Sequence, residues 1–320
     1  MEKENKKNKK FDVRLLFKAA PVIGLVLLVL FFAIMSDGRS VSAANIKILS
    51  NQVIFTALIS IGGIFAFSMG AIDMSMSGSV CCVAILAALA GVATHSMPVM
   101  IVVCIIASFI LGVLKSLLET YLKVPVFMVT IVLGMALTSL GNVLLGTQSN
   151  LSVASLVGAG QQTGLYIAIL VVFYIIAMFL FNYTKFGKSV RIIGGNPETA
   201  KQVGIRVQHV KLKSYLMGAA SICLTAIVIL LRSKSVNANT ASSLGMDMMV
   251  AIVLGGMPLS GGAKSKIAAS LIGASIITVL NNGLMVIGVD SGMIQLVRGI
   301  LFLAVVFITG FSYRTNLLTR

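Results

Sequence analysis

Long runs of apolar residues, separated by short polar segments, are the feature that most constrains this chain. Hydrophobic residues make up 58% of its 320 residues and charged residues only 11%, with a mean hydropathy of +1.03. Soluble domains carry about 25% charged residues, so this composition lies outside their range. The sequence therefore predicts an all-α, polytopic bundle of transmembrane helices.

The apolar runs predict about ten membrane spans, because an α-helix needs about 20 apolar residues to cross a bilayer. No small-residue cleavage site follows the first run, so we expect that span to be retained rather than removed as a signal peptide. The predicted spans are 19–35, 51–69, 78–94, 97–114, 124–146, 164–182, 212–231, 244–258, 267–287 and 292–311.

Basic residues between the spans predict the orientation of the chain, whose formal net charge is +16. Twenty of the 25 Lys and Arg residues fall in the segments 1–18, 115–123, 183–213, 257–266 and 312–320. Basic loops stay in the cytoplasm, so both termini are predicted to be cytoplasmic. Because these charges alternate with spans instead of covering one folded face, we expect no nucleic-acid binding.

The segments between the spans are too short to fold as independent soluble domains. We expect residues 1–18 and 312–320 to be cytoplasmic tails and residues 19–311 to form a single transmembrane domain. The largest predicted cytoplasmic loop, 183–211, carries a Gly-Gly-Asn-Pro turn followed by a short helix-competent run. A loop of this size offers a cytoplasmic partner a surface to bind.

The polar residues form no pattern typical of a catalytic or metal centre, so we expect neither an enzyme nor a cofactor in this chain. The carboxylates beyond the flank of the first span have no spacing suited to acid–base work: Asp73, Glu119, Glu198, Asp247 and Asp290. The cysteines lie in apolar segments and form no ligand set with the two histidines: Cys81, Cys82, Cys104, Cys223, His95 and His209.

The glycine-rich segment 255–265, GGMPLSGGAKS, is superficially similar to a phosphate-binding loop. In that motif Lys follows the second Gly directly, whereas Ala263 separates Gly262 from Lys264 here. We therefore expect no nucleotide hydrolysis by this chain, so that any use of ATP and Mg²⁺ would be supplied by another subunit. The glycines are predicted to shape a cytoplasmic turn: Gly255, Gly256, Gly261 and Gly262.

Asp73 and Ser75 lie between two apolar spans in the segment MGAIDMSMSGSV. A carboxylate at the bilayer centre costs roughly 2.5–3.5 kcal/mol, so it needs a polar cavity or a partner. One interpretation is a broken helix whose polar groups line or gate a solute path. The other is that Asp73 caps the following helix and serves only the scaffold.

Asn281 and Asn282 lie within the predicted span 267–287. Amides at this depth tend to hydrogen-bond across helices, which favours a structural role, and the alternative is that they line a polar conduit. Small residues elsewhere are expected to allow close helix packing: Gly62, Gly63, Gly134, Gly141 and Gly273.

Five motifs occur in order between about residues 45 and 310. They are NQVIFTALISIGGIFAFSMGAIDMSMSGSV from Asn51, KVPVFMVT from Lys123, FGKSVRIIGGNPETAKQVG from Phe186, DMMVAIVLGGMPLSGG from Asp247 and LNNGL from Leu280. Together they resemble the permease subunits of bacterial ABC importers for simple sugars, the ribose, xylose, galactose and autoinducer-2 group. The resemblance implies a multi-pass protein of the bacterial plasma (inner) membrane.

The chain departs from the motifs of that family at several positions. Ala71 replaces the second glycine of G-G-I-D-L-S-V-G-S, and the run from Asp73 to Gly78 is one residue longer. Met257 and Pro258 replace Thr-Ser, which stiffens the turn. Close relatives also carry nucleosides and polyols, so the motifs identify a family rather than a solute.

The resemblance implies an assembly of several chains. Two permeases, identical or homologous, would form the path within the membrane lipid, with a cytoplasmic ATPase and an extracytoplasmic solute-binding protein that largely sets specificity. Residues 197–204 would form the helix that couples to the ATPase, and the alternative is an amphipathic helix resting on lipid. The residues assigned to this element are Gly194, Gly195, Asn196, Pro197, Glu198, Ala200 and Gly204.

An ion-coupled secondary transporter is the main rival class. It would need a proton or sodium site within the membrane, for which Asp73 is the one candidate residue. An enzyme would need clustered carboxylates or histidines. The sequence therefore predicts the permease subunit of an ABC importer for a simple sugar or related polyhydroxylated solute, with a nucleoside or polyol permease as the alternative within the family.

Overall fold

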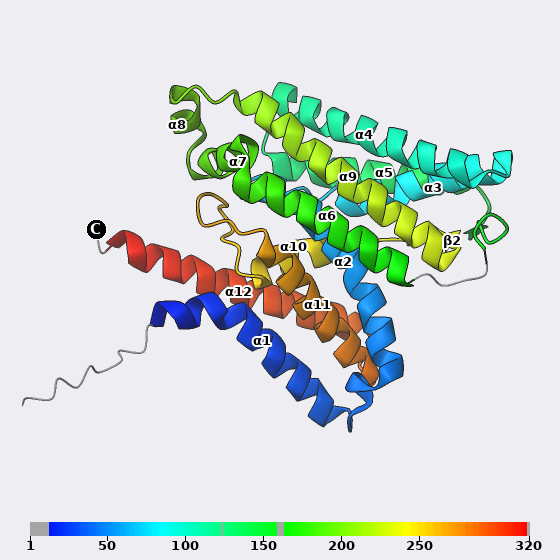
Figure 1. Cartoon of the computed structure of the whole chain (residues 1–320), viewed down its shortest axis with the longest axis horizontal. Coiled ribbons are helices and arrows are strands. Elements are labelled where there is room, and N and C mark those ends of the chain that lie inside the picture. The colour runs from blue at the N-terminus through cyan, green and yellow to red at the C-terminus, as the bar shows by residue number, and fades with distance from the viewer. Residues whose placement is uncertain (1–12, 123, 159–162, 319–320) are drawn as a thin grey trace, which may run out of the picture.

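The computed structural model describes residues 13–122, 124–158 and 163–318, and over these residues the chain is an all-α bundle (Figure 1). Ten helices correspond one to one to the predicted apolar segments. They are α1 (Val13–Met35), α2 (Ala43–Ser68), α3 (Met76–Thr94), α4 (Met97–Leu122), α5 (Val126–Leu145), α6 (Thr163–Tyr183), α9 (Val207–Ser233), α10 (Leu244–Leu254), α11 (Ala268–Val286) and α12 (Ser291–Leu318).

Shorter elements mark the two ends of the bundle. The helices α7 (Lys185–Gly195) and α8 (Pro197–Gln202) connect α6 to α9, and the end that carries them is called the α7–α8 end. The strands β1 (Leu151–Ser152) and β2 (Ser235–Val236) pair antiparallel. They lie at the opposite end of the bundle, called the ribbon end (Figure 1). A 3₁₀ turn, η1 (Arg39–Val41), connects α1 to α2.

Seven of the described helices are long and apolar enough to cross a membrane: α2, α3, α4, α5, α6, α9 and α11. Helix α10 has 11 residues, about 16 Å, against a hydrocarbon core of about 30 Å. The predicted span 244–258 is therefore wrong as one continuous helix, because the chain turns at Gly255 and Gly256. The count of ten spans and the cytoplasmic location of both termini stay predictions, and residues 1–12 and 319–320 lie outside the described residues.

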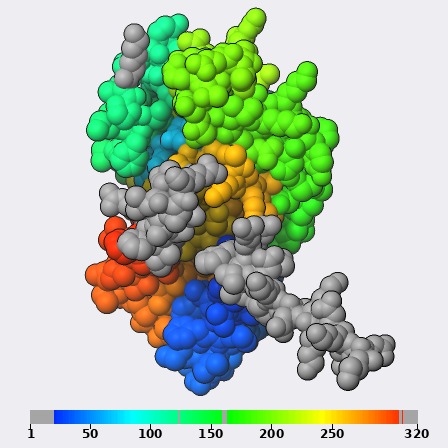
Figure 2. Space-filling view, turned by 90° about the vertical axis from the view of Figure 1, so that its left-hand side faces the viewer, coloured from blue at the N-terminus to red at the C-terminus, as the bar shows by residue number. Residues whose placement is uncertain are grey.

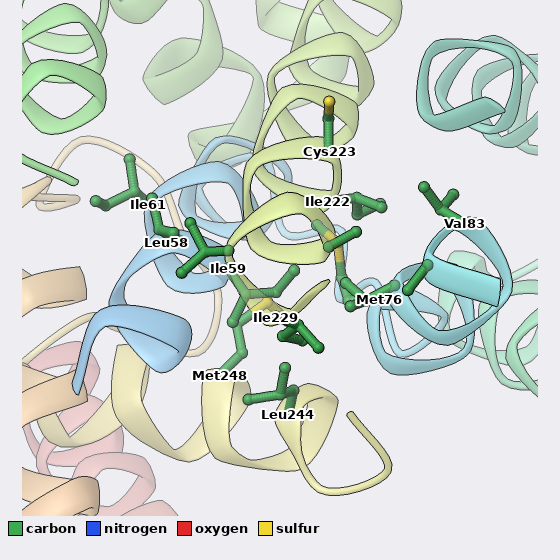
Figure 3. Packing of buried hydrophobic residues seen from close by; sticks show 14 of the residues in the cluster. Leu58, Ile59, Ile61, Met76, Val83, Ile222, Cys223, Ile229, Leu244 and Met248 are labelled. Atoms are coloured by element: carbon green, nitrogen blue, oxygen red, sulfur yellow. The ribbon is translucent and has the colours of Figure 1, made fainter. Parts of the chain in front are cut away.

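The core of the bundle consists of α2, α3, α9 and α11, in each of which most residues are buried. Figure 3 shows Leu58 of α2, Met76 of α3, Ile222 of α9 and Met248 of α10 in one cluster of buried apolar side chains. Lipid tails are as apolar as these side chains, so in a bilayer such contacts stabilise the bundle through close packing rather than through removal from water.

The helices α4, α5 and α6 form a looser periphery, in which fewer than a third of the residues are buried. Large apolar side chains such as Phe109, Val143 and Phe179 are exposed on them. In a membrane protein such faces contact lipid or another subunit. The bundle therefore presents an extensive apolar surface around a tightly packed centre.

Small residues allow the helices to approach closely, as predicted for Gly273 and its counterparts. A Cβ atom at Gly273 would overlap the carbonyl oxygen of Ala251, and one at Gly255 would overlap that of Ala269. Helices α10 and α11 thus meet backbone to backbone at two positions. The other predicted packing glycines also contact neighbouring elements: Gly62, Gly63, Gly134 and Gly141.

We expect Gly273→Ala to lower the melting temperature of the purified protein in detergent. The added methyl group forces α10 and α11 apart, and overpacking of this kind costs about 1–3 kcal/mol. Gly24→Ala is the matched control, because a Cβ at this position of α1 meets nothing within 4 Å. Equal melting temperatures for the two variants would contradict the close crossing.

Candidate functional site

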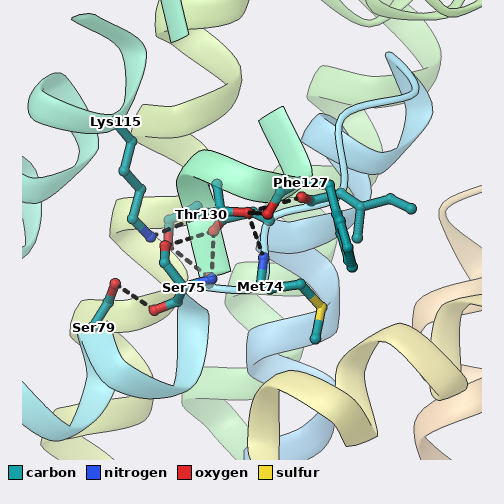
Figure 4. Close-up of polar contacts among 10 residues, drawn as sticks. Met74, Ser75, Ser79, Lys115, Phe127 and Thr130 are labelled. Carbon is teal, nitrogen blue, oxygen red and sulfur yellow. Dashed lines mark hydrogen bonds and ion pairs between the residues drawn. The ribbon is translucent and has the colours of Figure 1, made fainter. Parts of the chain in front are cut away.

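The segment between α2 and α3 is a break in the helices that is held by a buried ion pair. Asp73 Oδ2 lies 3.0 Å from Lys115 Nζ, and each side chain is only 2% exposed. Asp73 Oδ1 accepts hydrogen bonds from the backbone N–H of Ser75 at 2.9 Å and from its hydroxyl group at 2.6 Å. Figure 4 shows Lys115 of α4 reaching this segment, and Ser79 of α3 hydrogen-bonded beside it.

Helix α5 holds the same segment from another side. The hydroxyl oxygen of Thr130 accepts a hydrogen bond from the backbone N–H of Met74 at 3.2 Å (Figure 4). This hydroxyl group also lies 3.2 Å from the carbonyl oxygen of Ile72. Thr130, the last residue of the motif KVPVFMVT, therefore helps to position the break between α2 and α3.

The structure places both Asp73 and Ser75 in the interior, 3% and 0% exposed. The carboxylate is fully engaged by Lys115 and Ser75, a geometry that favours the scaffold interpretation. Asp73 lies in the turn just before α3, whose first residue is Met76. The N-cap residue of α3 is Ser75, and its side chain makes no capping hydrogen bond. A role for Asp73 and Ser75 in the path or gate stays a prediction.

The location of Lys115 corrects the sequence analysis, which counted it among the basic residues of a cytoplasmic loop. Helix α4 continues to Leu122, and Lys115 is 3% exposed within it. One turn later Glu119 pairs with Lys211 of α9 at 2.6 Å. A hydropathy pattern predicts that a span ends at the first charged residue. Helix α4 continues past Lys115 because partners on other elements neutralise its charges.

A second polar cluster joins three helices towards the ribbon end. Arg298 of α12 donates to Asp247 Oδ1 of α10 at 2.8 Å and to Asn281 Oδ1 of α11 at 2.7 Å. The amide of Asn281 also donates to Asp247 Oδ1 at 3.5 Å. The sequence analysis singled out Asn281 but missed its charged partners. The signal available in the sequence was the presence of opposite charges, Asp247 and Arg298, inside two apolar segments.

Asn282 makes a different contact from its neighbour, because adjacent residues point about 100° apart on a helix. Its side-chain amide pairs reciprocally with that of Asn45 on α2, with N···O distances of 2.7 and 3.1 Å. Both residues are buried. This pair has the geometry expected of an interhelical link, whereas Asn281 belongs to the charged cluster.

A cavity of about 210 Å³ opens beside these residues, between α2, α10, α11 and α12. A neighbouring cavity of about 370 Å³ between α10 and α12 shares Ser243 and Arg298 with it. The polar residues that line the smaller cavity are Gln52, Thr56, Ser243, Asp247, Thr278, Asn281, Asn282 and Arg298. The cluster is thus the polar wall of a hollow within an otherwise apolar bundle.

The loop predicted to dock a partner folds into two helices, of which the second has the local structure expected. Asn196 caps α8 by accepting from the backbone N–H groups of Glu198 and Thr199 at 2.9 and 3.3 Å. Pro197 occupies the first turn, and Gly204 follows the helix with a φ of +80°. Helix α7, which ends at Gly195, is not among the predicted elements.

Ala200 needs a correction, because it is 0% exposed and so lies on the inner side of α8. The exposed side carries Glu198 and Thr199, with Glu198 paired to Lys201 at 2.7 Å. Any surface that α8 offers to a partner therefore excludes Ala200. The role of this element in coupling stays a prediction.

The glycine-rich turn packs directly under α7. The backbone N–H of Gly262 donates to the carbonyl oxygen of Ser68 at 2.9 Å, and Gly194 approaches both groups closely. Figure 2 looks onto the α7–α8 end and shows residues of the turn beside the segment that contains α7 and α8. The turn, with positive φ angles at Gly256, Gly261 and Gly262, thus lies next to the predicted docking element.

Over the described residues, no group of three or more His, Cys, Asp or Glu side chains could hold a metal ion. The polar residues instead line a break in the bundle and a hollow beside it. These features are those of an integral membrane protein with polar clusters inside an apolar bundle.

The chain belongs to a family of permease components, described as "Branched-chain amino acid transport system / permease component", whose sequence model matches residues 45–306. It is therefore a transport subunit rather than an enzyme, and a multi-pass protein of the bacterial plasma membrane.

Individual relatives match along nearly their whole length. The chain is 31% identical over 299 residues to the ribose import permease protein RbsC of Bacillus subtilis, covering 91% of this chain and 92% of that protein. It is 26% identical to the xylose transport system permease protein XylH of Haemophilus influenzae, covering 89% and 94%.

A further match, to the probable ABC transporter permease protein YphD of Escherichia coli, is 34% identical but covers only 46% of this chain and 45% of that protein. No solved structure matches the chain.

We expect Lys115→Met to destabilise the protein by about 3–5 kcal/mol, because it leaves the carboxylate of Asp73 buried without an opposite charge. The double variant Asp73→Asn with Lys115→Met is expected to recover most of this loss. Melting temperatures in detergent test both. Lys201→Met is the control, since its exposed ion pair with Glu198 contributes at most about 1 kcal/mol.

An equal loss in the single and double variants would contradict a charge-balance role for this pair. Asp73→Asn alone separates the two interpretations of that residue. A folded variant that has lost solute uptake would favour the path, whereas a defect confined to expression or stability would favour the scaffold.

Proposed function

We propose that the chain is the membrane-spanning permease subunit of an ABC importer and forms the translocation path for a simple sugar or related polyhydroxylated solute. The observation that carries this proposal is the charge-balanced polar cavity. Asp247 and Arg298 neutralise each other, and amides and hydroxyl groups make up the rest of the polar wall. Such a wall suits neutral hydroxyl groups, which need hydrogen-bond partners rather than a charged trap.

The printed names of the relatives support this class of solute. They describe ribose import, xylose transport and, in Escherichia coli, a galactofuranose transporter permease. The family description names branched-chain amino acids instead. The cavity wall also includes Phe55, Leu244 and Met285, so the choice of a sugar over an amino acid rests on the names of these relatives together with the neutral polar groups of the wall.

The importer would need partners that this chain lacks. An ATPase subunit would use ATP and Mg²⁺ on the cytoplasmic side, and an extracytoplasmic binding protein would deliver the solute. The exposed apolar faces of α4, α5 and α6 supply surface for membrane lipid and for a second permease, identical or homologous.

We infer that α8 is the element on which the ATPase acts. It is capped and exposed, and it follows α7, whose Gly194 contacts the end of α2 without an intervening side chain. Lys211, near the start of α9, adds a second link because it pairs with Glu119 of α4. A push on α8 would thus reach the transmembrane helices through stiff contacts. The alternative is that α8 rests on lipid headgroups.

The double variant Glu198→Lys with Thr199→Arg is expected to abolish solute uptake and co-purification of the ATPase, while the protein still folds and reaches the membrane. Both residues are exposed, so the added charges alter the docking surface and not the packing of the bundle. Gln148→Lys with Ser149→Arg, also exposed but between α5 and β1, should leave ATPase co-purification unchanged. Retained co-purification in the α8 variant would contradict docking there.

The transport activity is tested in cells that lack the chromosomal copy of the chain, with and without the chain restored. We expect restored uptake of labelled D-ribose or D-xylose, no uptake of L-leucine, and sensitivity to ATP depletion rather than to ionophores. Uptake that follows an ion gradient would favour a secondary transporter. Affinity purification of the tagged chain should recover the ATPase and any second permease.

A further inference from the structure

The cavity between α2, α10, α11 and α12 has the features of a ligand site within a single permease chain. We propose that it binds the transported solute, a neutral polyhydroxylated molecule, at the ribbon end of the path, so that the permease itself selects its solute. This inference rests on the function proposed above. It adds a second selection step to the one expected of the separate binding protein.

The position of the cavity suits the entry of a solute rather than coupling to the ATPase. Helix α2 lines it with Gln52 and Thr56 and ends at Ser68, which contacts Gly194 and Gly262 at the α7–α8 end. Thr56 and Ser68 are 12 residues apart, about 18 Å along a helix. The cavity is thus separated from the predicted docking element by several turns of a well-packed core helix.

One buried polar group in the cavity wall has no partner among the described residues. Thr278 is 3% exposed and lines the cavity, yet its hydroxyl oxygen makes no hydrogen bond. Buried hydroxyl groups in folded proteins are nearly always hydrogen-bonded to protein, water or ligand. This oxygen atom is closed to water in the structure, so a ligand hydroxyl group in the cavity would become its partner when the Thr278 side chain turns towards the cavity.

The charged cluster also has hydrogen-bonding capacity to spare. A guanidinium group has five N–H donors, and within the described residues Arg298 uses one on Asp247 and one on Asn281. Because Arg298 and Asp247 cancel in charge, the cavity presents donors and acceptors without a net charge. This combination favours a neutral ligand with several hydroxyl groups over an anion or a cation.

The volume admits more than solvent. A site needs about 10–15 Å³ to hold one water molecule, and this cavity has about 210 Å³, with the neighbouring 370 Å³ reached past Ser243 and Arg298. A lipid tail would leave the carboxylate, guanidinium and amide groups facing hydrocarbon, which is costly. The lining is therefore matched to a small polar molecule.

Cysteine labelling tests whether water and sugar reach the cavity. In the purified full-length permease in lipid nanodiscs, Thr278→Cys should react with a small water-soluble methanethiosulfonate, and millimolar D-ribose or D-xylose should slow the reaction while L-leucine does not. Ile277→Cys is the matched control, because this neighbour on α11 is 0% exposed in the apolar core. The four native cysteines are buried, and the unsubstituted protein gives the background.

Each other outcome of the labelling overturns the proposal. Absence of labelling means that the cavity is closed to water, and labelling in detergent but not in nanodiscs means that lipid fills it. Labelling that sugar does not slow means a water-filled hollow without a solute site. Sugar binding is thus read directly, without requiring transport.

A transport measurement on the complete importer gives an independent readout. Thr278→Val keeps the shape and removes the hydroxyl group. It should lower the maximal rate of D-ribose uptake about fivefold, the equivalent of one hydrogen bond, and leave the half-saturating concentration set by the binding protein unchanged. The melting temperature and recovery of the ATPase should not change.

An unchanged rate in this variant would overturn the role of Thr278. If the unsubstituted importer moves no sugar at all, the proposed function fails instead, and the two failures are thereby distinguished.

Discussion

The packing of the α7–α8 end depends on the carbonyl oxygen of Ser68, at the end of α2, where three backbone segments meet. The backbone N–H of Gly262 binds this oxygen, and a Cβ atom at Gly194 or Gly261 would overlap it. Only glycine allows the loop before α11 and the helix α7 to meet the end of α2 in this way. Because no flexible side chain lies between them, α7 cannot move far unless α2 moves or the contact breaks.

Each of three buried acidic residues inside the bundle pairs with a basic residue from a different element. Asp73 pairs with Lys115, Glu119 with Lys211, and Asp247 with Arg298. Lipid tails and the side chains of Leu or Ile pack almost equally well against an apolar helix face. Apolar packing alone therefore does not determine which helices are neighbours. The ion pairs therefore specify which helices are neighbours. Additional hydrogen bonds offset the cost of desolvation at Asp73 and Asp247, whereas Glu119 Oε2 has no hydrogen-bond partner among the described residues.

Much of the fold could be predicted from the sequence, because apolar runs of about 20 residues have few alternatives in a bilayer. The same reasoning located α8, whose Asn196 and Pro197 are local signals of a helix start. The same reasoning was wrong about the location of Lys115 and about the length of α10. A buried lysine needs a partner 42 residues away in sequence, and the early end of α10 depends on a turn fixed by contacts with distant segments.

In the candidate site, too, individual residues could be predicted from the sequence but their partners could not. Asn281, Asn282 and Asp73 were recognisable as polar residues in apolar surroundings, but their partners come from other helices: Asn45, Lys115, Asp247 and Arg298. A single sequence states which groups need partners and not which groups supply them. The cavity exists only once four helices are assembled.

The short length of α8 has a consequence for how the protein is assembled. A six-residue helix is too short to be stable by itself, and Ala200 gives it a packed inner side only when α7 and α9 are already in place. The surface it presents at the α7–α8 end therefore forms late, after the surrounding helices have inserted and packed. A partner that recognises this surface would associate only with permease molecules that have finished folding, and immature chains would remain uncoupled from nucleotide hydrolysis.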